Sequence, residues 1–163
     1  MRRIIAMAML APAALLTAPS PTRSSAPSCV TAADVKDALG FEVRELTKGM
    51  KQYGPIWSCG FAATDENALP GVTVRIMIEP GTEATQRFND MRATVTAARG
   101  KPTEPDPIAV GERGMAYRTA SRTMAAAVKG GLLYSVDVGY GAVSKFGDKQ
   151  EATVRLLRKL MGG

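Results

Sequence analysis

The feature that most constrains the fold is a pair of cysteines, Cys29 and Cys59, which are the only two in the 163-residue chain. Cys29 follows a long leader of apolar and small residues, and Cys59 lies in the apolar segment IWSCGF. Three states are open to Cys29: one half of a disulfide, a free thiol, or the attachment point of a lipid. The residues on either side of Cys29 discriminate among these states.

Residues 1–26 have the three-part pattern of a secretory signal peptide. Arg2 and Arg3 provide the positive start, an apolar run extends from Ile4 to about Leu16, and small residues and prolines follow. An apolar run of about a dozen residues is too short to span a bilayer core as a helix. We expect residues 1–26 to be a signal peptide and flexible leader, the alternative being an unprocessed helix, and residues 27–163 to form a single α+β domain. The exported protein is then expected in the periplasm or outside the cell, without a transmembrane anchor.

Lipid attachment requires a small apolar box, roughly Leu-Ala-Gly, directly before the cysteine and directly after the hydrophobic run. Cys29 instead follows Ala26-Pro27-Ser28 and lies about twelve residues beyond Leu16. Two cysteines in an exported chain, with none left over, favour a disulfide between Cys29 and Cys59 over two free thiols or a lipid anchor. Closing a loop of roughly 30 residues would stabilise the fold by about 3 kcal/mol through the unfolded state.

The composition argues against most enzyme classes. The chain contains no histidine, which removes the most common general base, the usual zinc ligand and the common nucleophile–base pairs. No G-x-S-x-G, C-x-x-C, H-E-x-x-H or P-loop pattern is present either. We therefore expect no enzymatic activity, no cofactor and no metal.

The net charge is a weak indicator of partners. The formal charge of +6 includes three arginines of the leader, Arg2, Arg3 and Arg23, so that residues 27–163 carry +3. A charge of this size is poor support for nucleic-acid binding, and export argues further against it. We expect no nucleic-acid partner.

The residues after Cys29 predict a short helix with defined ends. Thr31 is a good N-cap, and Asp34 stands three residues later in a variant of the capping box. Val30 and Val35 occupy the two positions of a hydrophobic staple, and Gly40 suits the left-handed residue after the last turn. These signals predict a first helix between Thr31 and Gly40.

Alternating apolar residues predict an antiparallel sheet. The clearest strand is GVTVRIMIE, residues 71–79, and Gly130-Gly131 predicts a tight hairpin between two later strands. Helices are expected over 82–99 and near the C-terminus, where Ala152, Leu156 and Leu160 share a face. The prediction is an α+β fold of order αβββαβββα, with three helices, one disulfide and a mostly antiparallel sheet of about five to six strands. The strand candidates are 41–46, 56–63, 71–79, 108–118, 122–129 and 132–140.

One face of this sheet is the candidate binding site. Arg75 lies in mid-strand, and an arginine there must reach water or find an acceptor, for which Asp137 is the candidate partner. Either the face is an open, shallow polar trough, or a helix packs closely on its small residues. Tyr53, in a predicted loop, is placed for ligand contact. The face is expected to collect Ser58, Gly60, Ala62, Thr73, Arg75, Ala125, Ala127, Ser135 and Asp137.

Several stretches together resemble a known group of proteins. They are VTAADVKDALGFEV after Cys29, the second cysteine beside Trp57, GVTVRIMIEPG, and PIAVGERGMAY followed by MAAAVKGGLLYSVDV. The chain resembles the small exported proteins and lipoproteins of actinobacteria that carry domains of unknown function, and the extracellular sensor domains of bacterial receptor kinases. The resemblance implies a disulfide-stapled antiparallel sheet with helices and an envelope location. It offers no catalytic residues to carry over, and the lipid-box cysteine of the lipoproteins is missing.

The sequence favours a non-enzymatic, secreted or periplasmic binding or sensor-type module. Its ligand would be a small molecule, an envelope polymer or an envelope protein. The alternative is a secreted inhibitor or antagonist of an envelope enzyme, which would present a rigid loop such as 48–55 or 65–71. An enzyme that works without histidine is the third possibility.

Overall fold

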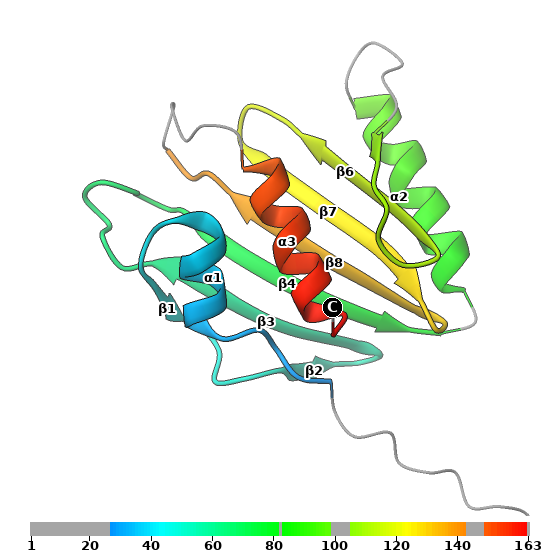
Figure 1. The fold of residues 1–163 in the computed structure, drawn as a ribbon, viewed down its shortest axis with the longest axis horizontal. Coiled ribbons are helices and arrows are strands. Elements are labelled where there is room, and N and C mark those ends of the chain that lie inside the picture. The colour runs from blue at the N-terminus through cyan, green and yellow to red at the C-terminus, as the bar shows by residue number, and fades with distance from the viewer. Residues whose placement is uncertain (1–26, 82, 99–104, 143–148, 163) are drawn as a thin grey trace, which may run out of the picture.

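The computed structural model describes residues 27–81, 83–98, 105–142 and 149–162, so the predicted signal peptide and leader, 1–26, lie outside the described residues. The described residues form three helices and one antiparallel sheet of eight strands (Figure 1). This confirms the α+β class, whereas the predicted five to six strands are too few. The elements are α1 (Ala32–Leu39), β1 (Val43–Glu45), β2 (Lys51–Tyr53), β3 (Ile56–Ala63), β4 (Thr73–Pro80), α2 (Ala84–Ala98), β5 (Asp106–Pro107), β6 (Arg113–Arg118), β7 (Arg122–Lys129), β8 (Leu132–Gly139) and α3 (Gln150–Leu160).

The two strands that sequence reasoning missed, β2 and β5, are short pieces at the two edges of the sheet. β2 and β5 have three and two residues, too few to show an alternating pattern. β2 reads Lys-Gln-Tyr and β5 contains a proline, so neither resembles a half-buried strand. The order is therefore αββββαββββα rather than αβββαβββα. The strands lie in the order β1-β3-β4-β8-β7-β6-β5, and β2 pairs with β3 on the same edge as β1.

The first helix has the ends that the sequence predicts. The Thr31 hydroxyl accepts the Asp34 N–H at 3.1 Å, and the Asp34 carboxylate accepts the Thr31 N–H at 2.9 Å, which completes the capping box. Gly40 follows the last turn with φ of 83°, a left-handed conformation that favours glycine. Val30 and Val35 are both buried, as expected of a hydrophobic staple.

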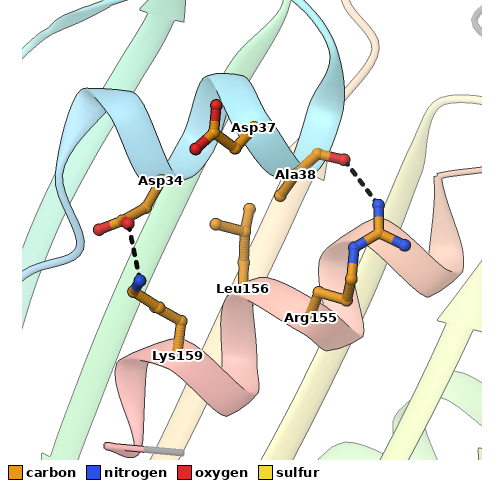
Figure 2. Close-up of a pocket in the computed structure, with 6 residues that line it drawn as sticks. All are labelled: Asp34, Asp37, Ala38, Arg155, Leu156 and Lys159. Atoms are coloured by element: carbon orange, nitrogen blue, oxygen red, sulfur yellow. Dashed lines mark hydrogen bonds and ion pairs between the residues drawn. The ribbon is translucent and has the colours of Figure 1, made fainter.

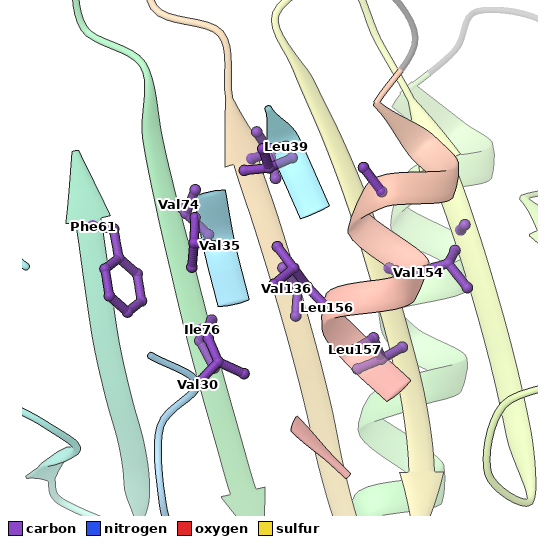
Figure 3. Close-up of a cluster of buried hydrophobic side chains, with 14 of the residues drawn as sticks. Val30, Val35, Leu39, Phe61, Val74, Ile76, Val136, Val154, Leu156 and Leu157 are labelled. Carbon is purple, nitrogen blue, oxygen red and sulfur yellow. The ribbon is translucent and has the colours of Figure 1, made fainter. Parts of the chain in front are cut away.

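Helices α1 and α3 pack side by side on one face of the sheet, called the covered face (Figures 1 and 3). Their apolar residues meet alternate residues of the central strands and form the main core. The core includes Val35, Leu39, Phe61, Val74, Ile76, Val136, Val154, Leu156 and Leu157.

The predicted disulfide joins Cys29 to Cys59, with Cα atoms 6.3 Å apart. Cys59 is buried on the covered face in β3, and Cys29 lies three residues before the first residue of α1. The bond therefore ties the start of α1 to β3 beneath it. An eight-residue helix has little stability of its own, so this link and the packing of α1 against α3 hold it in place.

The second face of the sheet is covered only in part. Helix α2 lies behind the sheet in Figure 1 and contacts β7 and β8. Its buried Phe88 packs with Met115 and Leu133, and its buried Val95 packs with Tyr117 and Met124. α2 thus covers the β6–β8 half of this face, and its start also reaches the end of β4, where Arg87 pairs with Glu79. The centre of the half formed by β3 and β4 is left exposed.

Candidate functional site

The strand register determines which predicted residues share the second face. Arg75 lies directly opposite Asp137 on β8 and opposite Gly60 on β3, so these three share a face, as the sequence predicts. Ala125 and Ala127 do not lie on this face: they are buried in the core of the covered face. Met124 is the residue opposite Asp137, and Ala126 is opposite Ser135. The prediction assigned the residues of β7 one position out of phase, and a shift of one residue moves every side chain of a strand to the other face of the sheet.

The β3–β4 half of this face is exposed at its centre. Arg75 and Thr73 are exposed, and Ser58, Gly60 and Met77 are half-buried. Both alternatives for this surface are therefore correct in part, because α2 covers its β6–β8 half and leaves the other half uncovered. We call the uncovered half the open face; it consists of Leu46, Lys51, Tyr53, Ser58, Gly60, Ala62, Thr73, Arg75 and Met77.

Asp137 marks the border between the open face and the part covered by α2. Its Oδ2 lies 3.3 Å from Nη1 of Arg122, and its Oδ1 is buried without a hydrogen-bond partner among the described residues. Burial raises the pKa of the Asp137 carboxyl, and the nearby charges of Arg122 and Arg75 oppose that rise. The prediction of a direct ion pair between Arg75 and Asp137 is therefore wrong, because the cation that pairs with Asp137 is Arg122.

Arg75 is left free by this arrangement. It forms no ion pair within the described parts of the chain, and its guanidinium acts on Asp137 only through space. Its neighbours in the same row of the sheet are Gly60, which has no side chain, and half-buried Asp137. The Arg75 side chain is therefore not enclosed by its neighbours on β3 and β8.

Tyr53 lies on this same face, which the sequence did not predict. The residue belongs to β2, where Lys51 pairs with Ser58 and Tyr53 pairs with Ile56. These pairings place Lys51 and Tyr53 on the side of Ser58 and hence of Arg75. The Tyr53 residue is 59% exposed, so its ring is accessible to a partner.

Leu46 is a residue of the open face that sequence reasoning missed. Its backbone N–H donates to the Gly60 carbonyl at 2.8 Å, and a Cβ on Gly60 would lie 3.8 Å from Leu46 Cδ1. The Leu46 side chain therefore lies over the space that Gly60 leaves empty, and it is 51% exposed. Leu46 and Tyr53 are the large apolar side chains most exposed in the described chain. No sequence signal marks Leu46, which ends a weak strand candidate.

A small pocket adjoins the open face at the start of α2. Its volume is about 120 Å³, and Ile56 and Glu79 line it together with Pro55 and Ala84. Arg87 of α2 reaches back to Glu79, with Nη1 and Oε2 2.7 Å apart. This ion pair neutralises Glu79, and the second acid of the lining, exposed Glu83, lies at the start of α2.

A second pocket, between α1 and α3, is lined by groups that join the helices (Figure 2). Lys159 Nζ lies 3.1 Å from Asp34 Oδ1, and an Arg155 N–H donates to the Ala38 carbonyl at 3.0 Å. The N–H of Thr31 is the main cause of the lowered pKa of Asp34, and Lys159 adds to the effect. These groups serve the packing of α1 against α3.

Two kinds of site are not found in the described residues. No group of three or more aspartate, glutamate, cysteine or histidine residues gathers there as a metal site would require. None of the described helices is long and apolar enough to cross a membrane.

Comparison with known proteins gives no match. No protein-family model, no curated protein and no solved structure matches this chain.

Proposed function

We propose that the protein is a non-enzymatic binding module of the cell envelope and that it binds its partner on the open face. The observation that carries the proposal is the unpaired Arg75 in the middle of an uncovered sheet surface, with Tyr53 and Leu46 exposed on the same side. Arginine and tyrosine are enriched where proteins bind partners. Tyr53 lies beside Ile56 and Leu46 beside Gly60, so a partner that spans this stretch of β3 would contact both.

The chemistry of the open face favours an acidic, extended partner. Arg75 and Lys51 form no ion pair with any described residue, so the face presents two uncompensated cations. The β3 positions between them are Ser58 and Gly60, which keep the surface shallow enough for a polymer or peptide to lie across it. An anionic envelope polymer, or an acidic segment of an envelope protein, has the matching charge and shape.

The export of the protein is part of the same proposal. The disulfide Cys29–Cys59 supports an oxidising compartment, where such bonds persist. The apolar leader of residues 1–26 supports a periplasmic or extracellular location without a lipid anchor. We also propose that the protein is related to the small exported actinobacterial proteins and receptor-kinase sensor domains that its sequence resembles.

A second candidate is the inhibitor of an envelope enzyme, and the segment 65–71 favours it. The Asp65 side chain accepts the N–H of Asn67 at 3.1 Å and of Ala68 at 2.9 Å. The Asp65 carbonyl accepts the Leu69 N–H at 2.9 Å. These bonds hold an exposed loop in one shape, which inhibitors need in order to bind tightly.

Binding of an acidic polymer tests the first candidate. Poly-glutamate is titrated calorimetrically into the exported protein, its Arg75→Ala variant and an Arg113→Ala control, which makes the same change of charge at an exposed position of β6. We expect saturable, salt-sensitive binding that Arg75→Ala weakens several-fold and Arg113→Ala leaves unchanged. Equal loss in both variants would indicate attraction by net charge alone and would contradict a site on the open face.

A further inference from the structure

The largest of the pockets described in this structure lies on the other side of the sheet, at the C-terminal end of α3. Its volume is about 450 Å³, within the range of small-molecule sites. It lies where α3 ends over the β5–β6 connection and the end of β7. Most of its lining is apolar, and the lining residues are Ala109, Val110, Gly111, Glu112, Lys129, Arg158 and Met161.

One wall of this pocket is closely packed, because the β5–β6 connection runs against β7 and the end of α3. Gly111 has φ of 64°, and a Cβ there would lie 2.4 Å from the Val128 carbonyl oxygen and 3.1 Å from Met161 Cε. Only glycine lets the connection pass this close to β7 and α3. The next residue, Glu112, donates its N–H to the same Val128 carbonyl at 2.7 Å. The pocket is therefore held in shape before any ligand binds.

The charged groups at the rim favour an anion. The Glu112 carboxylate accepts the Gly130 N–H at 2.8 Å, so the one acid of the lining already has a donor. Lys129 Nζ donates to the Met161 carbonyl at 2.9 Å, a neutral partner that leaves its charge uncompensated. Arg158 is exposed and pairs with no acid in the described segments. The rim therefore carries two cations and one carboxylate, a net charge of +1 beside an apolar hollow.

We propose that this pocket binds a single-chain carboxylate, such as a free medium-chain fatty acid. The carboxylate would lie at Arg158, where charge-assisted hydrogen bonds from a guanidinium are strong and directional. The hydrocarbon chain would cover exposed Ala109 and half-buried Met161 and lie against the edge of buried Val110. Lys129 attracts the head group while its bond to Met161 holds the end of α3. This site is separate from the open face and does not depend on the function proposed for that face.

The probe is decanoate at concentrations where it is monomeric. Its binding is measured by calorimetry and by changes in the amide chemical shifts of the protein. We expect saturable one-to-one binding with shifts around 109–112 and the end of α3, and no saturable binding of acetate, which lacks the apolar chain. Decanol, which lacks the charge, should bind more weakly than decanoate. Arg158→Ala should weaken decanoate binding about tenfold, the loss expected for one charge-assisted hydrogen bond.

Matched variants separate this proposal from alternatives. Met161→Ser, which shortens the apolar lining, should also weaken decanoate binding, whereas Arg75→Ala on the opposite face should leave it unchanged. Three results would each overturn the proposal. They are decanoate binding that does not saturate, equal affinities of the protein for decanoate and acetate, and unchanged decanoate binding by Arg158→Ala. Binding to vesicles of anionic lipid without binding of monomeric decanoate would overturn it as well, because it would indicate a membrane surface site. The poly-glutamate experiment is independent, so either result stands without the other.

Discussion

Removing the disulfide should cost most of the stability that holds α1 on the sheet. Cys29 and Cys59 are 30 residues apart, so the bond closes a loop of about that length in the unfolded chain. The loop-closure relation then gives a loss of about 3.6 kcal/mol in the free energy of unfolding at 25 °C. The loss should concentrate in α1, whose eight residues cannot form a stable helix alone.

The double variant Cys29→Ala/Cys59→Ala measures this loss without leaving a free thiol. Urea unfolding followed by circular dichroism should give a free energy about 3 to 4 kcal/mol below that of the oxidised protein. The reduced native protein serves as the control and should unfold close to the double variant. A difference of less than about 1 kcal/mol between the oxidised protein and the variant would refute the reasoning, since the unfolded chain would then not be constrained by the bond.

Two further perturbations probe individual groups. Thr31→Ala removes one half of the capping box and should lower the free energy of unfolding by about 1 kcal/mol, measured by urea unfolding; no change would contradict a role for the cap. Burial raises the pKa of Asp137 in the folded state, so the folded protein holds that proton more tightly than the unfolded chain. The contribution of Asp137 to stability is therefore fully present below the ordinary aspartate pKa and is lost as pH rises through the raised pKa. Unfolding of the native protein and of Asp137→Asn at a series of pH values should show the native protein losing stability relative to the variant as pH rises; the opposite slope would contradict the assignment.

Local signals predicted the parts of the fold that depend on neighbouring residues. The ends of α1 follow from Thr31, Asp34 and Gly40, because capping is decided within a few residues of chain. The disulfide follows from counting cysteines in a chain whose N-terminal residues predict an export signal. The facing of Arg75 and Asp137 follows from alternation in two well-patterned strands.

The remaining features depend on contacts that the local pattern does not contain. Three consecutive alanines in β7 carry no alternation, so the placement of Ala125 and Ala127 could not be decided from their own residues. The pairing of Asp137 with Arg122 depends on side-chain reach across two strands. The pairing of β2 with β3, which brings Tyr53 onto the open face, involves three exposed residues without a hydrophobic pattern.

The free energy of unfolding of Arg75→Ala tests most directly whether the open face is available for binding. Arg75 is exposed and makes no ion pair in the described chain, so the variant should lie within about 0.5 kcal/mol of the native protein. Arg122→Ala is the matched control and should be less stable than Arg75→Ala, because it removes the ion pair of half-buried Asp137. Native-like stability of Arg75→Ala is the result that the account predicts. A loss of about 3 kcal/mol would contradict it, because Arg75 would then be a buried partner that the fold requires.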